Sequence, residues 1–268
     1  FQMHGLSAID GDREIDWGYT SEDYANYRSD YPRSFYDRLH ALGIGCAGQR
    51  VLDLGTGTGF FARAFAKKGS NVLGVDLSQR QIEQARKLCM DDELEVEFQV
   101  GAVEDLSLEE YSFDVISAGQ SWLYFDKTRI IPLVKRLLKP GGNLMTGHYC
   151  WLPRLDPIAR ASEELILCYN PQWSSSDYSG EIPHQPGWSQ EGFNVCAFFY
   201  YDEEISFTRE SWMGRIRACR GVGATLSHEE VKAFNLDHEK LLKKIAPETF
   251  SILHRLDAHI YTEKPWQK

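Results

Sequence analysis

The stretch that decides the fold is Val51-Leu52-Asp53-Leu54-Gly55-Thr56-Gly57-Thr58-Gly59. A short apolar strand ends there in three alternating glycines, and the residues that follow, 60–68, predict a helix that Gly69 ends. Glycines between a strand and a helix let the backbone approach a ligand closely, and the helix N-terminus points at that ligand. Asp76 ends the next predicted strand, where a carboxylate can accept both hydroxyls of a ribose. The stretch therefore predicts a nucleoside-binding turn.

The alternation of strand and helix continues on both sides of this turn. Strands are predicted at 50–54, 71–76, 94–100, 113–118, 143–149, 193–207 and 252–261, and helices at 60–68, 79–90, 126–138, 157–169, 209–220 and 228–245. Strands that alternate with helices indicate parallel βαβ units with helices on both faces of the sheet. We predict an α/β fold: a doubly wound, mostly parallel, seven-stranded sheet with an N-terminal helical clamp and a lid-like insertion after the fifth strand.

The chain shows no internal repeat and no linker that would separate two domains. We predict a single domain over 1–268. Its expected parts are an N-terminal cap, a cofactor-binding core, an insertion or lid, and C-terminal strands and helices, at 1–47, 48–149, 150–192 and 193–268.

Composition narrows the class of protein. The 29 Lys and Arg against 39 Asp and Glu give a formal net charge of −10 over 268 residues. This balance argues against a nucleic-acid partner, because binding a phosphate backbone needs a positive surface.

None of the six cysteines forms a C-x-x-C pair, and we expect no metal. No uncharged apolar stretch approaches the ~20 residues that span a bilayer. We expect a cytoplasmic monomer or homodimer with a small-molecule substrate and no membrane partner.

Two cofactor classes fit the glycine turn. A dinucleotide site needs G-x-G-x-x-G, which fails from Gly55 at Phe60 but is permitted from Gly57, where the last position is Ala62. Asp53, however, would repel a pyrophosphate, and a negative charge there suits a cofactor with an ammonium or sulfonium group. The dinucleotide alternative stays open on these residues alone, but the charge disfavours it.

Five segments, in order and spacing, resemble the class I S-adenosylmethionine-dependent methyltransferases. They are the glycine stretch 51–59, the acidic second-strand motif 74–78, the adenine loop 101–106, the fourth strand 113–116 and the turn 137–142. The preceding Tyr27-Arg28-x-x-Tyr31-Pro32 resembles the small-molecule members, methyltransferase type 11 and trans-aconitate methyltransferase-like enzymes. The resemblance covers about 48–149 and implies a Rossmann-like fold, S-adenosylmethionine as cofactor, S-adenosylhomocysteine as product, and methyl transfer to a small molecule by in-line displacement.

The resemblance also implies a cofactor site. Its expected residues are Tyr19, Tyr27, Arg28, Asp53, Gly55, Thr56, Gly57, Gly59, Asp76, Leu77, Ala102, Val103 and Gln120. The glycine turn would pass under the methionine part, Asp76 would hold the ribose, and Leu77 would pack on the adenine. Gln120 would lie near the cofactor amino group, and Tyr19, Tyr27 or Arg28 would reach its carboxylate.

One position departs from the family pattern. Many relatives carry an acidic residue where Ala102 stands, to bind the adenine amino group. That bond must here be absent or supplied by Glu104 or Asp105.

The acceptor side is marked by aromatic residues, which are dense over 149–201. Such side chains can wall an apolar pocket, and their faces attract a cationic methyl donor. The candidates are Trp122, Tyr124, Trp151, Trp173 and Trp188. His148 and His184 are weak candidates for a general base, although a carboxylate or phenolate acceptor would need none. For each of these residues, ordinary packing remains the competing explanation.

Two other functions stay open. One is an RNA or protein methyltransferase of the same fold, which the charge of −10 disfavours. The other is a module that binds the cofactor without turnover, because the residues that decide turnover form no motif.

Overall fold

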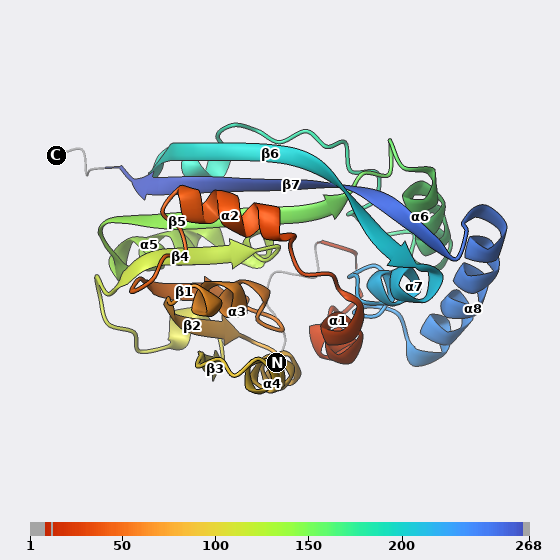
Figure 1. Ribbon diagram of the computed structural model, residues 1–268, viewed down its shortest axis with the longest axis horizontal. Coiled ribbons are helices and arrows are strands. Elements are labelled where there is room, and N and C mark those ends of the chain that lie inside the picture. Colours follow the sequence, from red (N-terminus) through yellow and green to blue (C-terminus); the bar gives the residue numbers. More distant parts are fainter. Residues whose placement is uncertain (1–8, 12, 265–268) are drawn as a thin grey trace. The chain divides into compact units, whose positions relative to one another are not determined.

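The strands form one seven-stranded sheet in the order β3-β2-β1-β4-β5-β7-β6 (Figure 1). The computed structural model describes residues 9–11 and 13–264. The strands are β1 (Arg50–Leu54), β2 (Asn71–Asp76), β3 (Glu97–Val100), β4 (Phe113–Gly119), β5 (Leu138–Trp151), β6 (Phe193–Thr208) and β7 (Thr249–Glu263). The first five pair in parallel, whereas the arrow of β7 runs against that of β5 in Figure 1. The doubly wound, mostly parallel α/β fold is thereby confirmed.

Helices α2 (Arg33–Ala41), α3 (Phe60–Lys67), α4 (Gln79–Asp91) and α5 (Lys127–Leu137) flank this sheet. Two of them begin at a side-chain cap: the Ser78 side chain accepts a hydrogen bond from the Gln81 amide, and the Asp126 side chain accepts one from the Thr128 amide. The α5 face of the sheet is covered by a buried apolar cluster that includes Leu52, Ile116 and Leu144.

Two strand boundaries differ from the sequence prediction, each for a local reason. β3 starts at Glu97 rather than Leu94, because the Leu94 amide still donates a 2.8 Å hydrogen bond to the Cys89 carbonyl near the end of α4. β5 starts at Leu138 rather than 143, because Leu138 already pairs with Phe113. The turn expected within 137–142 is therefore an irregularity inside β5, where the pairing with β4 shifts register.

The chain divides into two compact units, which we call the sheet unit and the helical unit. The sheet unit comprises 30–149, 182–201 and the residues from 256 onward; the helical unit comprises the residues up to 29, 150–181 and 202–255. The helical unit holds α1 (Ser21–Tyr27), α6 (Pro157–Tyr169), α7 (Arg209–Arg217) and α8 (His228–Ile245). Its own apolar core includes Trp212, Phe234 and Leu242.

The expected insertion, 150–192, is divided between these units. Residues 150–181, with α6, belong to the helical unit, and 182–192 belong to the sheet unit. A single domain whose insertion acts as a lid stays a prediction. Residues 1–8, at the start of the expected N-terminal cap, and 265–268 lie outside the described residues.

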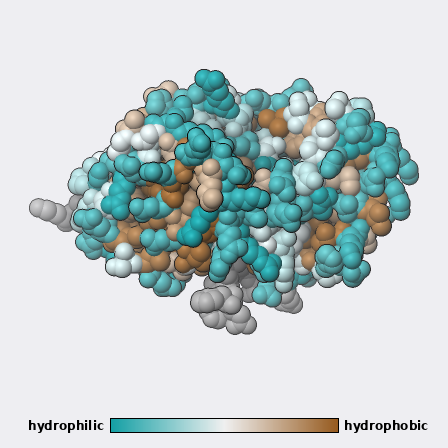
Figure 2. All heavy atoms as spheres, turned by 60° about the horizontal axis from the view of Figure 1, so that its bottom comes forward, coloured by the Kyte–Doolittle hydropathy of each residue, from teal (hydrophilic) through white to brown (hydrophobic). Residues whose placement is uncertain are grey.

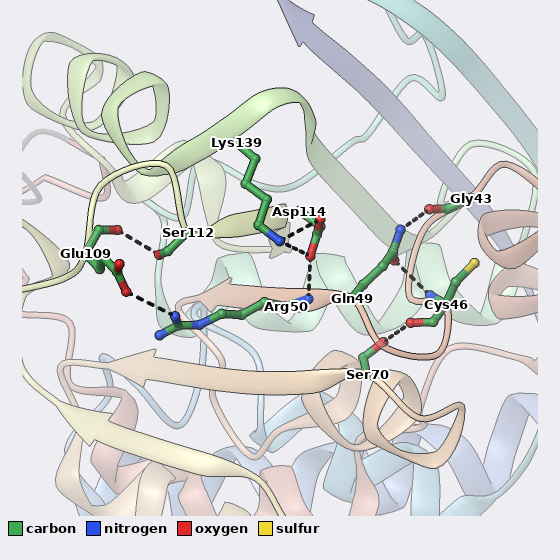
Figure 3. Close-up of polar contacts among 9 residues, drawn as sticks. All are labelled: Gly43, Cys46, Gln49, Arg50, Ser70, Glu109, Ser112, Asp114 and Lys139. Carbon is green, nitrogen blue, oxygen red and sulfur yellow. Dashed lines mark hydrogen bonds and ion pairs between the residues drawn. The ribbon is translucent and has the colours of Figure 1, made fainter.

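A polar cluster ties the amino ends of three strands together (Figure 3). The Asp114 carboxylate, in β4, accepts a 2.8 Å hydrogen bond from the Arg50 amide at the start of β1 and two of 3.0 Å from Lys139 Nζ at the start of β5. In the loop before β1, the Gln49 side-chain amide donates a hydrogen bond to the Gly43 carbonyl and accepts one from the Cys46 amide. The strands are thus held at the edge opposite their carboxyl ends.

The surface view in Figure 2 shows apolar and hydrophilic side chains interspersed on one face. Among the helices of the described residues, none has the combination of length and apolar character that crossing a bilayer requires. Within residues 9–11 and 13–264, no three His, Cys, Asp or Glu side chains are grouped as a metal site would need.

Candidate functional site

The glycine turn lies at the carboxyl end of β1, and its backbone conformation requires glycine. Gly55 has φ +61°, and a Cβ built on it would lie 2.6 Å from the Ser121 Cβ. Gly59 has φ +84° and precedes the first turn of α3. The Ser121 hydroxyl donates a 2.7 Å hydrogen bond to the Leu54 carbonyl, so the loop after β4 is fixed against the end of β1. Glycine at position 55 therefore lets the loop after β4 lie directly against the turn.

Asp76 ends β2 beside this turn, as expected. One carboxylate oxygen accepts a 2.9 Å hydrogen bond from the Gly57 amide, and the other accepts one of 2.9 Å from the Ser78 amide. Each carboxylate oxygen has a second lone pair, so both retain a place for a ligand hydroxyl. Burial raises the pKa of this carboxyl. Leu77, next in the chain, leaves 52% of its surface exposed, which suits an apolar platform beside a ribose site.

The predicted adenine loop is bonded to the same strand end. The Gly101 amide donates to the Asp76 carbonyl at 2.9 Å, which places Ala102 and Val103 next to Asp76. Val103 is buried, whereas Asp105 forms an exposed 3.7 Å ion pair with Arg129. The structure therefore brings the glycine turn, the acidic strand end and this loop together. An adenine contact by Glu104 or Asp105 stays a prediction.

Asp53 lies under the turn rather than in it. Its side chain is 2% exposed, and its two oxygens accept 2.7 Å hydrogen bonds from the Ser117 and Thr56 hydroxyls. Burial, with a smaller contribution from the Asp76 charge, raises the pKa of Asp53 to about 6. Asp53 thus anchors the turn to β4 and adds a negative charge below it at neutral pH. Ser117 was not expected from the sequence, because no local pattern links it to Asp53.

The raised pKa of Asp53 predicts a fall in stability as the pH rises. Between its ordinary value of 3.8 and about 6 the folded protein binds a proton that the unfolded chain has lost, so raising the pH favours unfolding. From pH 4 to pH 6 this group lowers the free energy of unfolding by about 2 kcal/mol. In Asp53→Asn, whose amide can still bond to both hydroxyls, urea unfolding should show a correspondingly smaller fall. An equally steep fall in the variant would contradict this assignment.

Gln120 follows β4 with φ +61°. Its amide N–H bonds to the Gly147 carbonyl at 2.9 Å, and its side-chain amide donates to the Tyr149 carbonyl. The side chain therefore joins the loop to β5, and a contact with the cofactor amino group stays a prediction.

Three expected cofactor residues belong to the helical unit. The Tyr27 hydroxyl donates a 3.3 Å hydrogen bond to Glu210, and its ring packs where a side chain at Gly214 would lie. Arg28 follows α1, and Tyr19 is 69% exposed. Their contact with a cofactor carboxylate stays a prediction.

The aromatic candidates for a substrate pocket fall into two groups. In the sheet unit, Trp122 is buried in the core, 4.8 Å between ring centroids from Trp188, which in turn packs on Tyr261 at 5.1 Å. Tyr124 belongs to the same short 3-10 helix as Trp122. Trp151 and Trp173 are instead buried in the core of the helical unit. Their burial favours packing, and a place for them in the pocket stays a prediction.

The two histidine candidates both lie in the sheet unit. His148, on β5, makes a 3.0 Å ion pair through Nδ1 with Asp257 on β7, and this carboxylate raises the histidine pKa against the opposing effect of burial. His184 is exposed and packs edge-on against Phe198 at 5.8 Å. Asp257 was missed in the sequence, because its partner lies 109 positions away.

Comparison with known proteins agrees with this geometry. Residues 51–142 match the family described as a methyltransferase domain. The chain is 38% identical over 122 residues to the ubiquinone biosynthesis O-methyltransferase of Xanthomonas oryzae pv. oryzae, covering 45% of this chain and 51% of that protein. It is 31% identical over 133 residues to an uncharacterized methyltransferase of Mycobacterium bovis, covering 50% and 51%. The chain thus spans about half the length of the curated relatives that it matches.

Among solved structures, the chain resembles an S-adenosylmethionine-dependent methyltransferase from Geobacter sulfurreducens, in complex with S-adenosyl-L-homocysteine. The TM-score is 0.53 at 18% identity, over 94% of this chain and 99% of that one. This likeness shows a shared fold.

Proposed function

We propose that this chain, whose residues 51–142 match a methyltransferase domain, is a class I S-adenosylmethionine-dependent enzyme that transfers a methyl group to a hydroxyl oxygen of a small molecule. The observation that carries the proposal is the carboxyl edge of β1 and β2, where the glycine turn, Asp76 and the adenine loop are bonded to one another. The oxygen acceptor is supported by the Xanthomonas relatives, which are ubiquinone biosynthesis O-methyltransferases.

The residues present fit the expected cofactor. Asp76 offers two carboxylate oxygens whose remaining lone pairs suit ribose hydroxyls, and the Gly57 amide of the turn holds one of them in place. Exposed Leu77 lies beside it as a surface for a flat apolar base. The negative charges of Asp53 and Asp76 favour a ligand with a cationic end and disfavour a pyrophosphate.

When bound, S-adenosylmethionine supplies a methyl group on a positively charged sulfur. The protein then contributes mainly by position, because holding donor and acceptor in line removes much of the entropy cost of the reaction. Asp76 and the turn fix the donor, and Asp53 fixes the turn to β4 through Ser117. Trp122 and Trp188, after β4 and before β6, pack on each other in the core of the sheet unit and so support the loops beside the carboxyl edge.

Calorimetric titration with S-adenosylhomocysteine tests the cofactor assignment. We expect one saturable site with a dissociation constant between about 1 μM and 1 mM, the range of ordinary enzyme substrates. NADH titrated under the same conditions should give no binding, because the negative charges of Asp53 and Asp76 disfavour a pyrophosphate at the turn. No heat with S-adenosylhomocysteine, or saturable heat with NADH alone, would refute the assignment.

A further inference from the structure

The position of His148 follows from the pairing of β4 with β5. Gly147 pairs with Gly119, the last residue of β4, and the Gly147 carbonyl accepts the Gln120 amide. His148 therefore lies one residue beyond the end of β4, at the edge that carries the glycine turn. Neighbouring strands lie about 4.8 Å apart, so β5 is about 10 Å from β1. This separation leaves room for an acceptor next to a donor held at β1.

Asp257 fixes the orientation of the His148 ring. Asp257 is only 2% exposed, and its carboxylate lies 3.0 Å from His148 Nδ1. An ionised carboxylate accepts hydrogen bonds and cannot donate them, so Nδ1 carries the proton. The other ring nitrogen, Nε2, is then left with a lone pair that can take a proton. The imidazole side chain is 37% exposed, so a ligand can reach it.

The surroundings of this pair on β7 are aromatic. Residues Asp257, His259 and Tyr261 alternate along the strand and so point to one face. The His259 ring stacks on Phe198 at 4.3 Å and on Tyr261 at 5.6 Å, and its Nε2 lies 2.8 Å from the Pro183 carbonyl. Burial lowers the pKa of His259, so this ring is neutral and His148 is the histidine that gains a proton near neutral pH.

We propose that His148, oriented by Asp257, is the catalytic base that takes the proton from the acceptor hydroxyl during methyl transfer. The oxygen forms its bond to the methyl carbon as the carbon–sulfur bond breaks, and the sulfur keeps that electron pair and becomes neutral. The hydroxyl proton moves to His148 Nε2 and then to solvent. Asp257 is a positioning residue, because it acts through His148. The inference rests on the proposed transfer to a hydroxyl.

The pair gives the reaction a characteristic pH dependence. A protonated imidazole cannot accept a proton, so the rate should rise with pH as His148 loses its charge. The Asp257 carboxylate raises the pKa of His148, so this rise should occur above the ordinary value of 6.5. His259 and Tyr261 also face the pair: burial lowers the pKa of His259 and raises that of Tyr261, so both stay neutral there. Asp257→Asn should move the rise to lower pH.

The test compares two hydroxyl probes, catechol and 4-nitrocatechol, with radiolabelled S-adenosylmethionine as the methyl donor. His148→Gln should lower kcat/KM for catechol by about 100-fold or more, the usual contribution of a general base. The loss should be smaller for 4-nitrocatechol, whose nitro group makes the hydroxyl acidic enough to ionise without help. Asp257→Asn should lower kcat/KM for catechol by a smaller factor, because the base remains but its ring is no longer held by a carboxylate. Affinity for S-adenosylhomocysteine should not change in either variant.

His228→Gln is the matched control, because His228 is an exposed histidine on α8 of the helical unit and should leave every rate unchanged. Wild-type kcat/KM for catechol in His148→Gln would overturn the inference. If the wild type methylates neither probe, the proposed function fails for hydroxyls of this class. Proton NMR then tests the His148–Asp257 pair without turnover. Asp257→Asn must lower the pKa of the His148 ring, and catechol must shift its signal in the S-adenosylhomocysteine complex; absence of either effect overturns the inference.

Discussion

Replacing Asp76 with alanine is expected to raise the dissociation constant for S-adenosylhomocysteine by roughly 100-fold. Two hydrogen bonds from ribose hydroxyls to a carboxylate account for about 3 kcal/mol, which corresponds to that factor. A second effect adds to the loss, because the Gly57 amide loses its 2.9 Å acceptor and the glycine turn is held less firmly. Calorimetry of the purified variant measures the constant directly.

The control for this variant is Glu97→Ala, which removes an exposed carboxylate from the neighbouring strand β3. It changes the net charge by the same amount and should leave the affinity unaltered. Circular dichroism should show that Asp76→Ala is folded at the temperature of the titration. A folded Asp76→Ala protein that binds as tightly as the wild type would remove the ribose role from this residue.

Replacing Gly55 with alanine is expected to lower the free energy of unfolding by about 2–5 kcal/mol. Left-handed backbone at φ +61° costs an L-residue roughly 1–2 kcal/mol, and forcing a methyl group to within 2.6 Å of the Ser121 Cβ costs roughly 1–3 kcal/mol more. The displaced turn should also bind S-adenosylhomocysteine more weakly. Urea unfolding followed by tryptophan fluorescence measures the first effect, and calorimetry the second.

Gly141→Ala separates the two contributions to the Gly55 result. Gly141 also has positive φ, +77°, but a Cβ there would meet no atom within 4 Å. Its replacement should therefore cost only the backbone contribution, about 1–2 kcal/mol, and leave binding unchanged. Equal losses of stability in the two variants would mean that the close approach to Ser121 carries no energy.

The group of residues at the carboxyl edge of β1 and β2 was largely predictable, because each of them is marked by a short local sequence pattern. The glycine turn, Asp76 and the loop at Ala102 each follow a strand, and the carboxyl ends of parallel strands share one edge, so their proximity follows from strand order alone. The pairs Asp53–Ser117 and His148–Asp257 were not predictable in this way. Their members are far apart in sequence, and only the register of neighbouring strands brings them into contact.

The aromatic segment shows a second limit of sequence reasoning. Aromatic density over 149–201 indicated a pocket, but density alone does not say which core a ring enters. Trp151 donates a 2.7 Å hydrogen bond from its indole nitrogen to buried Glu163 and packs on Trp212 at 5.5 Å in the helical unit, whereas Trp188 packs beside Trp122 in the sheet unit. The division of one segment between two cores depends on long-range contacts that no local pattern encodes.

The polar cluster around Asp114 has a consequence for how such a protein can diversify. It joins the starts of β1, β4 and β5 through bonds that involve none of the residues at the carboxyl edge (Figure 3). Loops that follow β4 and β5 can therefore accumulate substitutions without removing the attachment of the strands that carry them. Substitutions in these loops can therefore change which molecule binds beside the cofactor, while the strands that carry the loops stay in place.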